Sequence, residues 1–253
     1  MLSFIKRTTV VAILLALTTG ACDEDKKEAT APATTAFAAP VATEDAPKRM
    51  PEVSLHSAAV SIGLDEMSLT TPSFDQAFQT LLKKYPVDQP EQVIFTIDRK
   101  VKTSVATKIV YALIDAGAKS IEIRTRPRGE FPDKLVISSE KSIGNGIPGC
   151  TYVGMVQSNL SASFWKKQGG TAKRYSKGMA GPDLSAMHVV MHKEAKTCTS
   201  RVFLFSASPD VDWGHCFDIA GSVKAADPPY ENINQFVLLR TDPVPGKPVE
   251  LGS

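Results

Sequence analysis

The sequence has little of what a membrane span or a nucleic-acid partner requires. Its apolar run Val10–Leu17 has eight residues, whereas a helix that rises 1.5 Å per residue needs about 20 to cross a bilayer. Lys and Arg number 29 against 27 Asp and Glu, which leaves a net charge of +2. This balance supplies no electrostatic drive toward nucleic acid. We therefore expect neither a permanent membrane span nor a nucleic-acid partner.

Motifs that mark common enzyme classes are also missing. The chain has no Gly-x-Ser-x-Gly elbow of a serine hydrolase. The glycine-rich, basic segment 169–178 lacks the Gly-Lys-Ser/Thr of a phosphate-binding loop, and we interpret it as an inserted flexible loop. The acidic residues form no close pair of the kind that marks a glycosidase. We predict a non-catalytic protein without a cofactor.

Cysteine is scarce, with four residues in the chain. Cys150, Cys198 and Cys216 all lie in the second half, too far apart for the Cys-x-x-Cys spacing of a zinc site. In an oxidising compartment these three predict one disulfide and one odd thiol. The pairing stays open among three choices, and no metal site is assigned.

The fourth cysteine, Cys22, follows a segment that is typical of export. Lys6 and Arg7 precede the apolar run, and the small residues Thr19-Gly20-Ala21 come directly before Cys22. This pattern predicts a secretory signal peptide over residues 1–21. A cysteine at that place resembles a bacterial lipobox, although Thr19 stands where a lipobox usually has Leu. We predict lipid attachment at Cys22, since several acyl chains at about 0.8 kcal/mol per buried CH₂ anchor a protein stably.

Residues 22–49 are rich in Ala, Thr, Pro and charge. Such a composition cannot bury enough apolar surface to offset the entropy of ordering the chain. We predict a disordered tether that reaches on the order of 30 Å. Asp23 resembles the residue that retains lipoproteins at the inner membrane of some Gram-negative bacteria. The expected location is the periplasm, lipid-anchored to a bacterial membrane, with the inner membrane slightly favoured.

One strand-helix-strand pattern occurs twice in the remaining chain. In each copy the hydrophobic period changes from two to about 3.6 and back. Both copies end in Arg-Thr-x-Pro, at residues 124–127 and 240–243. The pattern predicts an internal duplication. The apolar runs that flank the helical segments are Val93–Ile97 with Ile121–Ile123, and Val202–Phe205 with Phe236–Leu239.

Each copy is preceded by a predicted hairpin and a predicted helix. The hairpins are expected over Val53–Leu64 and over Tyr152–Trp165, and the helices open at Pro72 and Pro182. Each half therefore reads as β-β-α-β-α-β. The predicted fold class is α/β, in the form of an α+β two-layer sandwich. We expect two tandem domains, over residues 50–140 and 141–253.

The segment 93–125 reads VIFTIDRKVKTSVATKIVYALIDAGAKSIEIRT. It resembles the periplasmic domain of the biopolymer-transport proteins ExbD and TolR, which has a strand ending in Asp, a basic turn with Val, and a helix of the type VVxxxDxLxxAG. The resemblance covers residues 53–127 and is fainter over 150–243. The matching positions are Asp98 at the strand end, Lys100 and Val101 at the turn, and Ile109 to Gly117 in the helix.

The resemblance implies a small two-layer domain that dimerises outside the inner membrane as part of a motor complex driven by the proton gradient. It implies membrane motor subunits or peptidoglycan as partners, and two copies in one chain imply a built-in pseudo-dimer. Family members enter the membrane through a helix that carries a proton-conducting aspartate. Because Val10–Leu17 has no acidic residue, we predict a scaffold or accessory protein and not a proton conductor.

A second interpretation is a periplasmic metal-binding protein or enzyme that uses the second half. Met187, His188, Met191 and His192 place Met and His at i and i+4, which on a helix makes an edge that suits copper. On the core side of a helix, however, Met more often fills space. The neighbours in His215-Cys216 would point about 100° apart on a helix and so would not face each other.

Basic side chains gather at the predicted strand ends of the first half. They are Arg99, Lys100, Arg124 and Arg126. Charged side chains at such positions usually stay solvated. We therefore assign no binding site to them.

Overall fold

The computed structural model describes residues 50–85, 92–144, 146–178, 181–195, 197–226, 230 and 232–252. The predicted signal peptide, the lipid-attachment residue Cys22 and the predicted tether lie outside the described residues. All described residues belong to the unit Pro47–Ser253. Among them, no helix has the length and apolar character needed to cross a bilayer.

The first half forms its strands and helices where the hydrophobic period changes. In β4, Val93, Phe95 and Ile97 are buried and alternate with half-buried residues, which is the period of a strand with one face on a core. Helix α2 ends where Gly117 takes a φ of 113°, a conformation that favours glycine. The elements are β1 (Val53–Leu55), β2 (Ala59–Ile62), β3 (Asp65–Ser68), α1 (Phe74–Leu82), β4 (Val93–Ile97), α2 (Thr103–Asp115), β5 (Ser120–Arg124) and β6 (Lys134–Ser138).

The second half differs in having strands that are buried on both faces. Every residue of β7 and of β12 is buried, as expected for parallel strands covered on both sides. The elements are α3 (Glu140–Ile143), β7 (Tyr152–Val156), β8 (Ala162–Lys166), β9 (Lys173–Tyr175), β10 (Lys177–Gly178), β11 (Gly181–Pro182), α4 (Leu184–Ala195), β12 (Val202–Ala207), α5 (Trp213–Lys224) and β13 (Gln235–Leu238).

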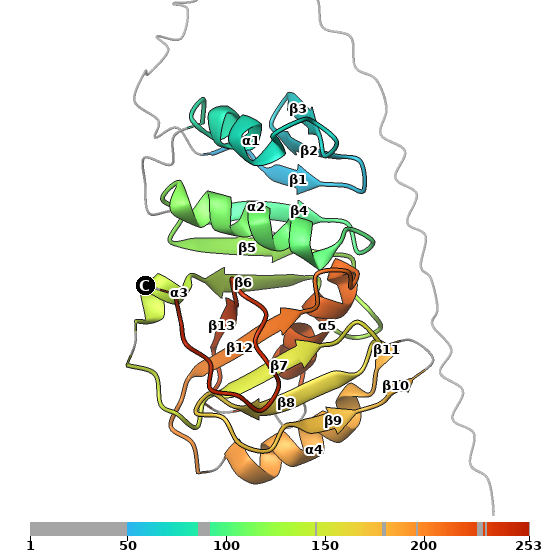
Figure 1. Cartoon of the computed structure of the whole chain (residues 1–253), viewed down its shortest axis with the longest axis vertical. Helices are drawn as coiled ribbons and strands as arrows, with labels where there is room; N and C mark the ends of the chain where they lie inside the picture. Colours follow the sequence, from blue (N-terminus) through green and yellow to red (C-terminus); the bar gives the residue numbers. More distant parts are fainter. Residues whose placement is uncertain are drawn as a thin grey trace, which may run out of the picture. The chain divides into compact units, whose positions relative to one another are not determined.

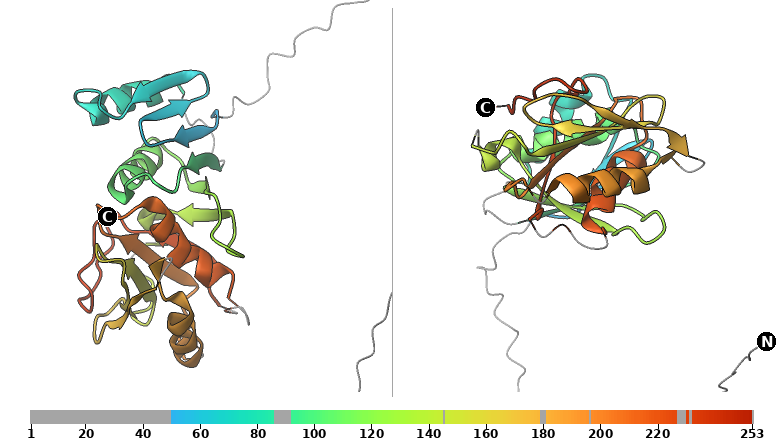
Figure 2. Two further views of the ribbon diagram at one scale, coloured as in Figure 1. Left: turned by 90° about the vertical axis from the view of Figure 1, so that its right-hand side faces the viewer. Right: turned by 90° about the horizontal axis from the view of Figure 1, so that it is seen from below.

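Eleven strands of the described chain form one mixed sheet, in the order β3-β2-β1-β4-β5-β6-β13-β12-β7-β8-β9. The first half supplies the order β3-β2-β1-β4-β5, and the second supplies β9-β8-β7-β12-β13 from the other edge. Strand β6 lies between them, antiparallel to β5 and parallel to β13. The two halves follow one another along this sheet (Figures 1 and 2).

This architecture confirms the mixed α/β class, and it corrects two details of the sequence analysis. The predicted hairpin of each half is a three-stranded meander, because β3 and β9 extend it. The interpretation of residues 169–178 as an inserted flexible loop is wrong, since Lys173–Tyr175 pairs with β8 as an edge strand. The division into two ExbD/TolR-type domains stays a prediction.

The shared Arg-Thr-x-Pro ends are one residue out of structural register. Phe95 of β4 faces Ile123, whereas Phe205 of β12 faces Leu238. Helices α2 and α5 begin at Thr103 and Trp213, which makes Phe95 and Phe205 equivalent. Arg124 then corresponds to Leu239 and not to Arg240. The repeated motif therefore does not place its two arginines at the same position of the fold.

Two apolar cores cover the two faces of the sheet. The larger includes Ile109 of α2 and Phe217 of α5, and so lies on the helical face. The smaller contains Trp165, Leu204 and Val249, the last from the C-terminal segment. That segment ends beside α3 (Figure 1), where the Gly252 N–H donates to Glu140 over 2.6 Å. The second half is therefore closed on the face that the first half leaves largely open.

Helices α2 and α5 are capped reciprocally by the two halves. The first N–H groups of a helix have no partner within it, and here each helix donates them to the turn that precedes the other. The pairs are Thr103 N to Val211 O (2.8 Å), Ser104 N to Pro209 O (3.2 Å), Trp213 N to Val101 O (2.7 Å) and Gly214 N to Arg99 O (2.9 Å). Arg99 thus corresponds to Pro209, and Ser104 to Gly214, in a pseudo-symmetric contact between the halves.

Candidate functional site

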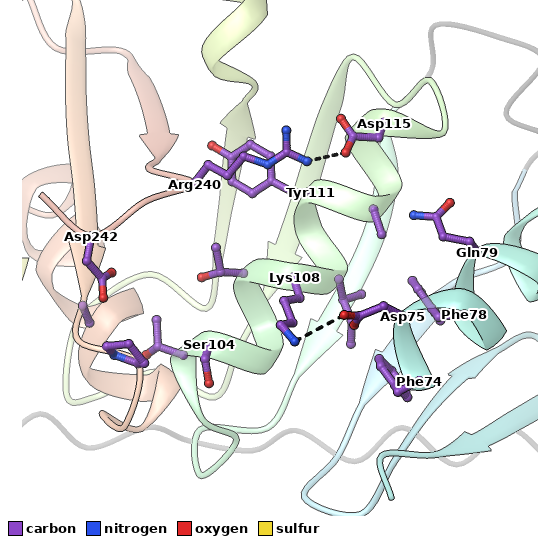
Figure 3. A pocket seen from close by; sticks show the side chains of 16 residues that line it. Phe74, Asp75, Phe78, Gln79, Ser104, Lys108, Tyr111, Asp115, Arg240 and Asp242 are labelled. Atoms are coloured by element: carbon purple, nitrogen blue, oxygen red, sulfur yellow. Dashed lines mark hydrogen bonds and ion pairs between the residues drawn. The ribbon is translucent and has the colours of Figure 1, made fainter. Parts of the chain in front are cut away.

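A cleft of about 380 Å³ lies along α2, between α1 and the chain that follows β12 and β13. Figure 3 shows the side chains that line it. The lining residues from α1 are Phe74, Asp75, Phe78 and Gln79; those from α2 are Thr103, Ser104, Thr107, Lys108, Ile109, Tyr111, Ala112 and Asp115; and those from the second half are Ala207, Pro209, Arg240 and Asp242. Both halves therefore contribute to the site.

The cleft exists because α2 directs one face toward it. Positions 104, 108, 111 and 115 recur at intervals of three and four, which places them on one side of a helix. Phe74 and Phe78 of α1 stack at 5.8 Å between ring centroids and form the apolar wall. Phe78 and Tyr111 are buried, so the floor is firmly packed.

Two ion pairs cross the cleft and its rim (Figure 3). Lys108 Nζ lies 3.4 Å from Asp75 Oδ2. The Arg240 guanidinium pairs with Asp115 and also lies over the Tyr111 ring, 4.8 Å from its centroid. Both pairs are solvent-exposed, so each contributes on the order of 0 to 1 kcal/mol to stability. They neutralise two of the carboxylates that line the cleft.

Tyr111 anchors the floor of the cleft from below. Its hydroxyl lies within hydrogen-bond reach of Glu140 Oε1 (3.0 Å) and of the Leu238 carbonyl oxygen. Burial, and then the Glu140 carboxylate, raise the pKa of Tyr111 well above its usual value. The phenol is therefore neutral and acts as a fixed donor. Glu140 also accepts the backbone N–H of Arg240 over 2.7 Å and that of Gly252 over 2.6 Å, and so links the cleft wall to the C-terminal segment.

Asp242 is the carboxylate of the cleft that no cation of the described residues pairs with. Its Oδ1 accepts a hydrogen bond from Ser206 Oγ over 3.1 Å. Partial desolvation raises the pKa of Asp242, the Ser206 hydrogen bond opposes this, and the charge of Asp210 adds to it. The residue lies just after the carboxyl end of β13, where open α/β sheets commonly bind ligands.

The arrangement is suited to binding. A pocket of this volume, with apolar walls and a few placed polar groups, is typical of ligand sites. Three carboxylates line it against two cations, so the site favours a ligand of positive charge. Among the described residues, Asp75 and Asp115 each have a cation as partner, whereas Asp242 has only the Ser206 hydroxyl.

The cysteines predicted from the sequence fall into two places. Cys150, just before β7, forms a disulfide with Cys198, which lies between α4 and β12. This resolves the pairing that the sequence left open. Cys216 is a free, fully buried thiol in α5, and burial raises its pKa far above the usual value. It is therefore held as a protonated core residue.

The His and Met residues of α4 are divided between two surroundings. Met187 and Met191 are fully buried in the main core. His188 Nδ1 lies 2.8 Å from the Tyr230 hydroxyl, and the His192 ring stacks on Tyr230 at 4.3 Å. Within the described parts of the chain, no three His, Cys, Asp or Glu side chains gather in a way that would hold a metal ion.

The glycine-rich segment does not present free backbone donors in the way an anion-binding loop does. The Gly169 N–H donates to the Lys166 carbonyl and the Gly170 N–H donates to the Gly246 carbonyl. Lys173 instead pairs with Glu194 of α4 over 2.8 Å. The segment therefore fastens β9 to the rest of the second half.

The basic cluster of the first half is partly internal. Arg99 donates two hydrogen bonds to Asp218 of α5, over 2.9 and 2.7 Å, and that carboxylate is fully buried. Arg124 pairs with Glu122 of the same strand. Sequence reasoning missed the Arg99–Asp218 pair and the cleft, because Arg99 and Asp218, like Asp115 and Arg240 of the cleft, lie more than a hundred residues apart. The one local signal for the cleft was a polar residue, Asp242, three residues after the apolar run Phe236–Leu239.

Comparisons of the chain with protein-family models, with curated proteins and with solved structures found no match in any of the three.

Proposed function

We propose that this chain is a non-catalytic lipoprotein of a bacterial envelope that acts as a scaffold or binding module. In this proposal it consists of two tandem domains of the ExbD/TolR periplasmic type, anchored through a lipid on Cys22. It is an accessory to a transport complex driven by the proton motive force, or it holds peptidoglycan. The cleft along α2 is its ligand-binding surface.

The observation that carries the proposal is the equal strand order of the two halves, each with its helices on the same face of one sheet. A domain type that functions as a dimer needs such a paired arrangement. The reciprocal capping of α2 and α5 supports it, because each helix begins on the other half as it would in a two-fold dimer. The disulfide Cys150–Cys198 is consistent with a compartment outside the cytoplasm.

The binding role is tested with the full-length protein, purified murein sacculi and detergent extracts of envelopes. We expect retention of the protein on sacculi or capture of a polytopic membrane subunit from the extract. Ala112→Trp, which fills the cleft, is expected to reduce retention or capture at least about tenfold. Val189→Trp adds the same side chain at an exposed position of α4, and is expected to leave it unchanged.

The envelope location is tested separately. Radioactive palmitate is expected to label the wild type and not Cys22→Ser, and the variant is expected to leave the membrane fraction.

Metal analysis of the purified protein addresses the alternative function. Stoichiometric metal that is lost in a His188/His192 double substitution, together with no retention on sacculi or extract, would replace the scaffold by a metal carrier.

A further inference from the structure

We propose that the cleft binds the ammonium group of a lysine-type side chain presented by a polypeptide, with Asp242 as its counter-ion. This inference deepens the proposed function, and rests on its assignment of the cleft as the ligand-binding surface. It names the chemistry of the ligand, which the proposal above leaves open.

The first argument is the charge that the cleft leaves uncompensated. Asp75 pairs with Lys108, and Asp115 pairs with Arg240. Asp242 has a hydrogen bond from Ser206 to one oxygen, and no cation among the described residues reaches its other oxygen. Asp210 lies near enough to raise the pKa of Asp242 after the effect of desolvation. A cation is thus the ligand charge that this end of the cleft lacks.

The second argument comes from the other half of the molecule. There the turn after β4 supplies Arg99, which neutralises the buried carboxylate of Asp218. The equivalent turn, after β12, supplies Pro209, as the matched capping bonds of Arg99 and Pro209 establish. Proline brings no charge, and the same correspondence places Lys108 at the position of Asp218. The arginine–aspartate pair is therefore not repeated, and this turn offers Asp242 no arginine.

The third argument is the shape and lining of the site. Figure 3 shows the Asp242 side chain at one end of the cleft, on the chain that follows β13 and directed toward α2. Ala207 and Pro209 supply apolar surface beside it, which suits an aliphatic stem. A compact ammonium has three donors, for which the Asp242 carboxylate supplies acceptor oxygens. The cleft of about 380 Å³ also has room for chain on either side of such a residue.

The test uses two probes that differ by a single charge: Nα-acetyl-lysine N-methylamide and its norleucine analogue. Binding to the full chain is followed by amide chemical shifts in an NMR titration. We expect the lysine probe to shift amides of α2 and of residues 207–210 and 240–242. We expect it to bind about tenfold more tightly than the norleucine probe, since a charge-assisted hydrogen bond is worth about that factor.

Asp242→Asn is expected to weaken binding of the lysine probe about tenfold and to leave the norleucine probe unchanged. Asp65→Asn is the matched control, because it removes the same charge at a carboxylate outside the cleft that pairs with Lys84 over 3.4 Å; we expect a change of less than about twofold. The comparison of probes on the wild type needs no variant, so it stands even if Asp242→Asn impairs folding.

Equal binding of the two probes, or shifts confined to another surface, would overturn the assignment. Pentylamine binding as tightly as the lysine probe would overturn its polypeptide part, because the backbone would then contribute nothing. These outcomes are distinct from failure of the proposed function. A protein that binds the lysine probe at α2 but ignores sacculi and envelope extracts keeps this chemistry and loses the envelope partner.

Discussion

The carboxylate of Asp218 illustrates how much one residue contributes at the contact between the halves. It is fully buried and receives two hydrogen bonds from Arg99, whose side chain is only 23% exposed. Removing one member of a buried ion pair leaves the other charge uncompensated. We predict that Asp218→Asn lowers the free energy of unfolding by roughly 3 to 5 kcal/mol. Urea denaturation followed by tryptophan fluorescence measures it.

The matched control is Asp212→Asn. Asp212 pairs with Lys102 over 2.7 Å and so also joins the halves, but both side chains are substantially exposed. An exposed pair contributes less than about 1 kcal/mol. Equal losses of unfolding free energy in the two variants would show that burial does not determine how much the Arg99–Asp218 pair stabilises the protein.

A second residue-scale prediction concerns pH and His188. Burial, and then the charge of His192, lower the pKa of His188 in the folded state. In the unfolded chain the pKa of His188 is near 6.5, so as the pH falls below about 6.5 the unfolded state binds a proton before the folded state does. The free energy of unfolding therefore declines from about pH 6.5 downward, until the pH passes the pKa of the folded state. Each such proton contributes at most about 1.4 kcal/mol per pH unit. Burial also lowers the pKa of His215, so its contribution has the same sign.

His188→Asn removes this titration while an amide can still reach the Tyr230 hydroxyl. We expect the fall in unfolding free energy between pH 7 and pH 5 to become smaller in this variant. His56→Asn, at an exposed turn before β2, controls for the loss of a histidine as such. An unchanged pH dependence in His188→Asn would contradict the prediction.

At the scale of elements, the disulfide fastens the chain before β7 to the chain before β12. It closes a loop with a sequence separation of 48, and cross-linking a loop of this length removes entropy mainly from the unfolded state. We predict that the double variant Cys150→Ser/Cys198→Ser loses about 2 to 4 kcal/mol of unfolding free energy. Dithiothreitol is expected to destabilise the wild type and Cys216→Ala, and to have no effect on the double variant.

The elements that could be predicted from the sequence are those with a local hydrophobic period. Strand β4, helix α2 and strand β12 lie where their patterns place them, because one face of each is buried against the helical core. Strand β3 has no such pattern: Asp65–Ser68 is polar and half exposed at a sheet edge. Strand β3 forms because its backbone pairs with the neighbouring strand β2, and the side-chain pattern of residues 65–68 does not indicate this pairing.

The candidate site was less predictable than the fold, for the same physical reason. Its walls combine α1, α2 and the chain after β13, and no periodicity within one segment reports contacts between distant segments. Arg99 shows the difference clearly. As a charge at a strand end it reads as solvated, and only the fold brings it to a carboxylate 119 residues away.

At the scale of the whole molecule, the two halves depend on each other at three levels. Strand β6 of the first half pairs with β13 through Ile137 and Phe236. Helices α2 and α5 each begin on a turn of the other half. The Arg99–Asp218 pair then neutralises a buried charge across the contact. A half without its partner would leave helix N–H groups, a buried carboxylate and a sheet edge exposed together.

We therefore predict that the halves do not fold alone, although each carries a full set of repeated elements. Fragments 50–140 and 141–253, expressed separately, are each expected to unfold without a cooperative transition, because unsatisfied helix N–H groups and the unpaired Asp218 cost several kcal/mol of a total stability of about 5 to 15 kcal/mol. Mixed at equal concentration, they are expected to recover one cooperative transition and the near-ultraviolet circular dichroism of the intact chain. The same mixture with Asp218→Asn in the second fragment is expected to associate at least tenfold more weakly. Cooperative unfolding of either fragment by itself would contradict this prediction. It would mean that the contact joins two independent domains, and that the helix caps and the buried ion pair form after each domain has folded and are not required for its folding.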